Sequence, residues 1–183
     1  MTHSKRFLLA TTLAAVAAFS VACGGTTTVN TSADAAGGSG TASAADAPAK
    51  IGSSITLSGM EDLQMKVTVL KVDQQVASSN EYITPDAGNR YVGVKLKLEN
   101  VGKTAYNDSP TNGAALVDTK DQSFDADYAE VATPALGSPK IAPGDTRVGW
   151  ITFQVPKKAK LKKFQMTLDS GFADQTGEWM VGK

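Results

Sequence analysis

Two of the side chains that most often carry chemistry are nearly missing from this chain. Among its 183 residues there is one cysteine, Cys23, and one histidine, His3. A lone cysteine excludes an intramolecular disulfide, so a folded domain has to be stabilised by its apolar core. Both residues lie where export signals are cleaved, and cleavage before Cys23 would leave a chain without histidine. Hydrolytic sites built on a histidine base would then be excluded.

The chain also lacks an excess of charge of either sign. The sequence has 18 basic and 18 acidic residues. Cleavage before Cys23 removes Lys5 and Arg6 and no acidic residue, so 16 basic residues would remain against 18 acidic ones, a net charge of −2. This balance predicts no nucleic-acid partner.

The N-terminus has the pattern of a signal peptide. A short polar start ends in Lys5-Arg6, and the 16 residues from Phe7 to Ala22 are all apolar, Ser or Thr. This length suits a signal peptide and is short for a membrane-spanning helix. Small residues, Ser20-Val21-Ala22, precede Cys23. We therefore assign residues 1–22 to a signal peptide.

Two peptidases could cleave before Cys23. The ordinary signal peptidase accepts small residues at positions −3 and −1, and the lipoprotein peptidase requires a cysteine at +1. Lipoprotein signals usually carry Leu at −3, where this chain has Ser20. We expect lipidation at Cys23, with acyl chains such as palmitate, because this single cysteine falls at the end of the apolar run. The expected location is the extracytoplasmic face of the cell membrane; the alternative is a plain secreted protein.

Residues 23–50 have the composition of a disordered tether. From Gly24 to Lys50 almost every residue is Gly, Ala, Ser, Thr or Asp, and the one large aliphatic residue is Val29. Such a segment buries too little apolar surface to offset its ordering entropy. A flexible linker of this length spans roughly 30 Å.

From Ile51 onward, apolar and polar residues alternate with a period of two. The alternation predicts half-buried strands with one wet face. Apolar residues occupy every second position in four runs: Met65, Val67, Val69; Val92, Val94, Leu96, Leu98; Ile151, Phe153, Val155; and Phe164, Met166, Leu168. Shorter candidate strands are 54–57, 114–117 and 179–181.

Turn residues separate these runs, and no amphipathic helix of three turns is present. About seven short strands with this patterning predict an all-β fold, a single immunoglobulin-like antiparallel β-sandwich over residues 51–183. A closed barrel is the alternative. An immunoglobulin-type disulfide between the sheets is excluded by the cysteine count.

Four stretches resemble an uncharacterised family of Gram-positive and actinobacterial lipoproteins, catalogued as a domain of unknown function. They are 66–69 with Val72; 88–100; Asp118 with Asp121 and Phe124; and 141–156. The family is related in fold to the mycobacterial immunoprotective extracellular antigen, an immunoglobulin-like sandwich. The resemblance implies this fold and an extracellular setting. It implies no activity, cofactor or catalytic residue.

Few residues are arranged for catalysis or metal binding. No nucleophile elbow or Ser-x-x-Lys pair occurs. The weak metal candidates are Asp118, Asp121, Asp125 and Asp127. Clustered carboxylates can bind Ca²⁺, although this spacing is not that of an EF-hand and a solvated turn explains it as well. A pair drawn from the same aspartates could also serve a glycan hydrolase.

Two features suggest an interaction surface. Lys157, Lys158 and Lys160 crowd one connection, followed by Lys162 and Lys163, and could contact anionic headgroups or teichoic acids. Such a run also deters strand pairing at a sheet edge. Trp150 is out of phase with Ile151 and therefore faces outward. It forms a recognition surface, or it is covered by a loop or by the C-terminal segment with Phe172 and Trp179.

We therefore expect a non-enzymatic, immunoglobulin-like binding module that Cys23 anchors to the membrane. Its partner would be an envelope protein or a cell-wall polymer, and we expect a monomer without cofactor. A structural lipoprotein with no discrete ligand, or a carboxylate-based enzyme acting on glycans, are the alternatives.

Overall fold

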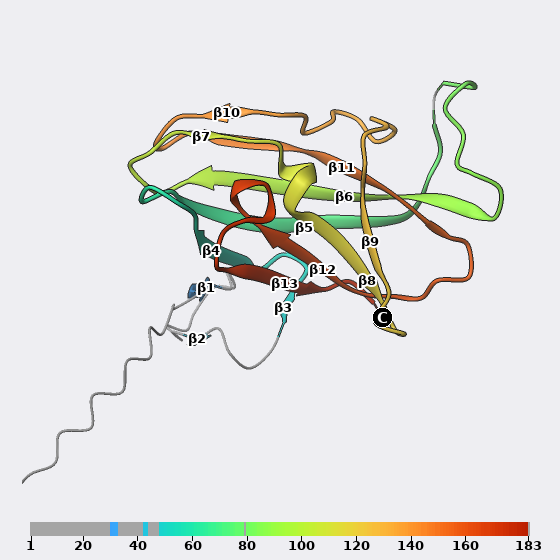
Figure 1. Cartoon of the computed structure of the whole chain (residues 1–183), viewed down its shortest axis with the longest axis horizontal. Coiled ribbons are helices and arrows are strands. Elements are labelled where there is room, and N and C mark those ends of the chain that lie inside the picture. The colour runs from blue at the N-terminus through green and yellow to red at the C-terminus, as the bar shows by residue number, and fades with distance from the viewer. Residues whose placement is uncertain (1–29, 33–41, 44–47, 79, 183) are drawn as a thin grey trace, which may run out of the picture.

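The alternating segments form an antiparallel β-sandwich, seen in Figure 1. The computed structural model describes residues 30–32, 42–43, 48–78 and 80–182. Within these residues no α-helix occurs, and the helical turns are two short 3₁₀ segments, η1 (Pro110–Gly113) and η2 (Asp169–Gly171). The all-β sandwich predicted from the sequence is therefore confirmed.

The described strands are more numerous than the seven predicted. They are β1 (Asn30–Ser32), β2 (Ala42–Ser43), β3 (Ala49–Lys50), β4 (Ser54–Ser58), β5 (Gln64–Val76), β6 (Asn89–Asn100), β7 (Tyr106–Asn107), β8 (Ala114–Asp118), β9 (Ser123–Asp127), β10 (Lys140–Ile141), β11 (Thr146–Pro156), β12 (Leu161–Thr167) and β13 (Thr176–Met180). The additional strands are mostly two or three residues long, too short to show an alternation.

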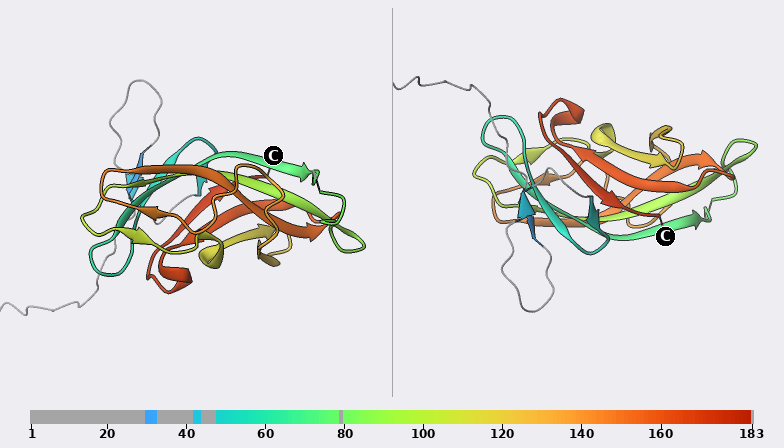
Figure 2. Two further views of the ribbon diagram at one scale, coloured as in Figure 1. Left: turned by 90° about the horizontal axis from the view of Figure 1, so that it is seen from above. Right: turned by 90° about the horizontal axis from the view of Figure 1, so that it is seen from below.

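Two layers pack face to face, as Figure 2 shows from above and below. One layer has the order β4-β5-β6-β11, and the other has the order β8-β12-β13-β3. Strand β9 joins them because it pairs with β8 through Phe124 and with β11 through Ala126. The β9 segment was not predicted, since its aspartates suggested a solvated turn.

The core lies between the layers and consists of the apolar residues of the alternating runs. Its largest fully buried side chains are Trp179, Tyr106, Phe153, Phe164, Leu57, Met65, Leu96, Leu98, Leu116, Ile141, Ile151 and Met166. Phe153 on β11 meets Phe164 on β12 edge to face, with ring centroids 6.1 Å apart. This aromatic pair links one layer to the other without a disulfide.

The C-terminal segment completes the second layer. Trp179 on β13 packs against Phe164, with ring centroids 5.7 Å apart. Its indole N–H donates to the carbonyl oxygen of Ser53 at 2.9 Å, which satisfies its buried polar atom. The residues beyond the family-like stretches are thus part of the sandwich core.

Regular structure begins earlier than expected from composition. Strand β1 pairs with β4 and with β2, and β3 runs parallel to the edge of β13. All three lie inside the 23–50 segment that was predicted to be a disordered tether. Backbone pairing to an existing edge needs little apolar surface, so composition did not reveal these strands.

A loop packs beside β11 at a buried glycine. The backbone of Trp150 donates to the carbonyl of Pro134 at 3.0 Å and accepts from the N–H of Leu136 at 2.9 Å. A Cβ at Gly149 would lie 2.6 Å from the Cα of Leu136. Only glycine lets the 134–136 segment approach β11 so closely.

Arg90 holds the turn between β11 and β12. Its guanidinium donates to the carbonyls of Pro156 at 2.7 Å, Lys157 at 2.9 Å and Ala159 at 3.1 Å, while its Nε donates to Gln74 at 2.9 Å. Partial burial lowers the pKa of Arg90 from its ordinary value. The planar fork of donors therefore joins the β5–β6 hairpin to this turn through backbone carbonyls.

Replacing Gly149 should destabilise the fold. The Gly149→Ala variant forces the added methyl group against the backbone of Leu136, and overpacking of this kind costs about 2 kcal/mol. Thermal unfolding of the variant should show a lower midpoint than the wild type. The control is Val148→Ala at the preceding, exposed position, which should leave the midpoint nearly unchanged. Equal midpoints for Gly149→Ala and the wild type would contradict this packing.

Arg90→Lys should loosen the β11–β12 turn, because an ammonium group cannot reach carbonyls in both directions at once. The expected loss is about 1–3 kcal/mol in urea unfolding, since hydrogen bonds from charged donors are lost. Hydrogen exchange should accelerate at Ala159. Arg147→Lys is the matched control because the Arg147 guanidinium donates to its neighbour, Thr146. Unchanged exchange in the turn would refute this role.

Candidate functional site

Cys23 and the whole signal segment, residues 1–22, lie outside the described residues, so lipidation stays a prediction. Of the helical turns in the part of the chain that the structure describes, none is long and apolar enough to cross a membrane.

The lysine-rich connection forms one end of the sandwich. A hollow of about 360 Å³ lies between the β8–β9 turn and the β11–β12 turn, and its lining includes Lys120, Lys158 and Lys160. The two turns are joined by the backbone N–H of Thr119, which donates to the carbonyl of Lys160 at 2.8 Å. We call Lys120, Lys157, Lys158 and Lys160 the basic end.

The neighbouring lysines are neutralised, whereas those of the basic end are not. Lys162 donates to Asp121 at 2.9 Å, which lowers the pKa of that carboxyl group, and Lys163 donates to Glu178 at 2.5 Å. Burial opposes ionisation of Glu178, but hydrogen bonds from Lys163 and Gln165 hold its pKa below the ordinary value. Within residues 48–78 and 80–182, no ion pair is formed by the four lysines of the basic end.

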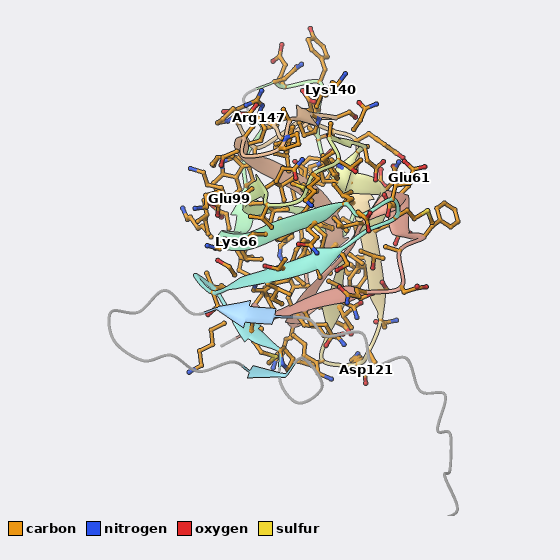
Figure 3. The ribbon with its side chains drawn as sticks, turned by 90° about the vertical axis from the view of Figure 1, so that its left-hand side faces the viewer. Glu61, Lys66, Glu99, Asp121, Lys140 and Arg147 are labelled. Carbon is orange, nitrogen blue, oxygen red and sulfur yellow. The ribbon has the colours of Figure 1, made fainter. Side chains whose placement is uncertain are left out.

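The four aspartates do not form one site. The Asp118 carboxylate is buried and accepts from the backbone N–H groups of Lys120 at 2.8 Å and Gln122 at 3.0 Å, so it shapes the β8–β9 turn. Asp121 extends into solvent, at the lower end of Figure 3. Asp125 and Asp127 leave the outer side of β9, because Phe124 and Ala126 pack on the core.

The metal and hydrolase hypotheses both required these carboxylates to converge. In the part of the chain described here, no group of three or more His, Cys, Asp or Glu side chains could hold a metal ion. The four aspartates lie on two elements: Asp118 and Asp121 lie at the β8–β9 turn, whereas residues 123–127 pair as β9 and direct Asp125 and Asp127 to a sheet face. Three of the carboxylates accept hydrogen bonds from nearby groups: Asp118 and Asp127 from backbone N–H groups, and Asp121 from the ammonium group of Lys162.

Trp150 faces outward, as its phase predicted, beside the exposed Val148. The C-terminal segment does not cover it: Trp179 is buried in the core, and Phe172 is 77% exposed. The backbone of the 134–136 loop pairs with Trp150 on the β9 side instead. The side chain remains half-buried on the outer face of β5, β6 and β11.

Two lysines flank the Trp150 ring. The Nζ of Lys71 lies 5.8 Å and that of Lys95 5.7 Å from its centroid, within the range of cation–π attraction. The ring packs flat onto β6 because Gly93 has no side chain; a Cβ there would come within 3.0 Å of the ring. Figure 3 shows Lys66 and Glu99 on one outer side of the molecule, and the strand registers place Trp150 on this same face of the β5–β6–β11 layer.

Trp150 and the basic end are separate surfaces. Lys157 lies seven positions after Trp150 along β11 and its turn, or roughly 20 Å in an extended strand. The sequence had grouped both into one interaction surface, and the fold places them at mid-strand and at the strand end.

The opposite end of β6 is acidic. A hollow of about 330 Å³ there is lined by residues that include Glu61, Asp108 and Asp169. Burial and the charges of Asp108 and Asp169 raise the pKa of Tyr106, so this phenol stays neutral. The aspartates of this hollow stabilise neighbouring turns. The Asp108 carboxylate accepts hydrogen bonds from the backbone N–H and the hydroxyl of Ser170, and the Asp169 carboxylate accepts one from the backbone N–H of Met60.

Sequence reasoning missed three residues that shape these surfaces. Arg90 organises the basic end, and Lys71 and Lys95 flank Trp150. The alternation around Val94 does put Lys95 on the outer face. Its position opposite Trp150 depends on the register between β6 and β11, which one strand alone does not reveal.

Solved structures with the same fold include three bacterial proteins, while no curated protein matches the sequence. The secreted protein MPT63 of Mycobacterium tuberculosis has a TM-score of 0.57 at 13% identity, over 75% of this chain and 99% of that one. The candidate lipoprotein ycdA of Bacillus subtilis has a TM-score of 0.51 at 18% identity, over 69% of this chain and 38% of that one. The yjhA protein of Bacillus subtilis has a TM-score of 0.50 at 16% identity, over 72% of this chain and 98% of that one.

The resemblance noted from the four sequence stretches is confirmed by a family model, which matches residues 59–176, more than half of the chain. The match extends from the β4–β5 turn to the first residue of β13, so it covers both the basic end and Trp150. The chain belongs to the family defined by the domain of unknown function DUF4352.

Proposed function

We propose that this chain is an exported lipoprotein, anchored by Cys23, whose β-sandwich is a non-enzymatic module that contacts an anionic component of the envelope through the basic end. The observation that carries the proposal is the basic end itself: within the described residues its four lysines form no ion pair, and three of them, Lys120, Lys158 and Lys160, line a hollow held by Arg90. Each part of the proposal has its own support and its own test.

The anchor is supported by the order of segments in the sequence. A 16-residue apolar run ends in Ser20-Val21-Ala22, and the single cysteine follows at once. Structures that share the fold include a secreted mycobacterial protein and a candidate lipoprotein of Bacillus subtilis. Membrane attachment through diacylglycerol would place the sandwich outside the cell.

Binding at the basic end is supported by charge and by position. Each lysine near an anionic surface contributes about 1 kcal/mol of attraction. Strand β3 runs beside β13, and after β13 the backbone N–H of Val181 donates to the carbonyl of Lys162, two residues beyond Lys160 of the basic end.

A non-enzymatic role is supported by the state of the carboxylates. The hydrolase alternative needs two facing carboxylates about 5–10 Å apart in a cleft. Asp118 already accepts two backbone hydrogen bonds, and Asp121 is paired with Lys162. Both groups serve the β8–β9 turn in this fold.

Cys23→Ala should release the protein from the membrane. Two acyl chains at about 0.8 kcal/mol per buried CH₂ make attachment effectively permanent, and without the thiol the ordinary peptidase can still cleave after Ala22. Cell fractionation should find the wild type in membranes, with the intact mass of a diacylated chain starting at Cys23, and the variant in the medium. Ser20→Leu is the control and should remain anchored. A wild-type chain that retains Met1 would refute the anchor.

Charge reversal at the basic end should abolish binding to anionic surfaces. The released Cys23→Ala chain is sedimented with phosphatidylcholine vesicles that do or do not contain phosphatidylglycerol. Changing Lys157, Lys158 and Lys160 to Glu should weaken binding to the anionic vesicles at least about 100-fold, given about 1 kcal/mol for each lysine.

The matched control changes three exposed lysines elsewhere, Lys50, Lys103 and Lys140, to Glu, with the same change in net charge. It should bind almost as the parent does. Equal losses in both triple variants, or binding by the parent that ignores vesicle charge, would reject the basic end as the contact surface. A parent chain that binds neither vesicles nor wall polymer would favour a structural lipoprotein without a ligand.

A further inference from the structure

We propose that the outer face around Trp150 is a second binding site, which takes an acidic sugar unit, a pyranose ring bearing a carboxylate or phosphate group. The inference goes beyond the proposed function, because this site lies at mid-strand and uses none of the lysines of the basic end. Three adjoining features of the outer face carry it.

The first feature is the ammonium group of Lys95 on the β6 side of Trp150. Lys71, Lys95 and Lys97 share this face with the carboxylates of Asp73 and Glu99. Lys97 pairs with Glu99 at 2.9 Å, and Lys71 lies 3.9 Å from Asp73. Within the described residues Lys95 has no acidic partner, and its ammonium group lies over the Trp150 ring. An anionic group beside the ring would complement it.

The second feature is a hollow on the β9 side of Trp150. Its volume is about 110 Å³, which is room for a polar substituent of a sugar ring. Its lining is rich in hydrogen-bonding groups, including Ser109, Thr111, Asp127, Glu130, Ser138 and Thr152. Tyr128, which is 80% exposed, stands at the same hollow.

The third feature is a buried hydroxyl group without a partner. Thr152 lines the hollow and is 3% exposed, and among the residues that the structure describes its Oγ1 has no hydrogen-bond partner. It lies two residues from Trp150 on the same face of β11 and opposite Asp127 of β9. Folded proteins rarely leave such a group unsatisfied, so it points to a ligand or water that bonds to it.

These features match the three parts of an acidic sugar. The C–H groups of the ring can pack on the negative face of Trp150. Its anionic group would lie toward Lys95 and Lys71, across β6 and β5. Its hydroxyl groups would enter the hollow, donating to Asp127 and Glu130 and bonding to Thr152, since carboxylates accept hydroxyl hydrogens. The carboxylates on the β9 side thus orient the ligand with its charge toward the lysines.

The test uses the full chain purified from membranes in a neutral detergent, with trigalacturonate as the acidic probe and maltotriose as its uncharged counterpart. Trigalacturonate should change the tryptophan emission saturably, and maltotriose should bind at least tenfold more weakly. Trp179 is fully buried and serves as an internal reference. Trp150→Phe should abolish the change in emission.

Calorimetric titration of two site variants and one control variant separates the contributions of Lys95 and Thr152. Lys95→Gln should weaken trigalacturonate binding about tenfold, as expected for one charged hydrogen bond, while Lys140→Gln on β10 should leave it unchanged. Thr152→Val should weaken binding severalfold and also raise the unfolding temperature, because it removes an unsatisfied buried hydroxyl. If Thr152 served the fold alone, Thr152→Val would change the unfolding temperature without weakening trigalacturonate binding.

Three results would overturn the inference. Equal affinity for the acidic and neutral probes would remove the role of the lysines. Full binding by Trp150→Phe and Lys95→Gln would place the ligand elsewhere. Loss of trigalacturonate binding on charge reversal of Lys157, Lys158 and Lys160 would assign it to the basic end. If the acidic probe binds normally while that charge-reversal variant no longer binds vesicles, the two sites are independent.

Discussion

The sandwich depends on apolar contact between its two layers, because the chain has no disulfide to join them. Phe153 of one layer meets Phe164 of the other edge to face, and Trp179 packs against Phe164 from the last strand. Burial of these rings is the main source of stability in such a core. It also fixes which face of every strand points outward. The positions of Trp150 and Lys95 on the surface are therefore a consequence of how residues of β6 and β11 pack inside.

The residues that match the family pattern mostly support the fold. Arg90 bonds to carbonyls of the β11–β12 turn, and Asp118 shapes the β8–β9 turn beside it. At the other end of β6, the Asn100 side chain donates to the carbonyls of Thr104 and Ile141. These polar side chains replace backbone partners at the ends of strands. They therefore define the turns that connect the strands of this scaffold.

The two proposed surfaces follow from different physics. At the basic end, like charges stay close together because Arg90 and backbone hydrogen bonds hold the turn that displays them. Such a surface attracts any dense negative charge and discriminates little. Around Trp150, an aromatic ring, an ammonium group and a buried hydroxyl group lie on two adjacent strands, β6 and β11. A few polar groups placed beside an aromatic surface favour one shape of ligand.

The alternation of apolar residues by itself determined the all-β class, the buried faces of β5, β6, β11 and β12, and the outward direction of Trp150, because side-chain direction in a strand has a period of two. Composition alone excluded a disulfide. Only the tertiary structure decided that β9 is a strand, that Trp179 lies in the core, and that Asp118 and Asp125 diverge. It alone brought Lys71 and Lys95 to Trp150, because register between strands depends on packing of the whole sandwich and leaves no trace in any single strand.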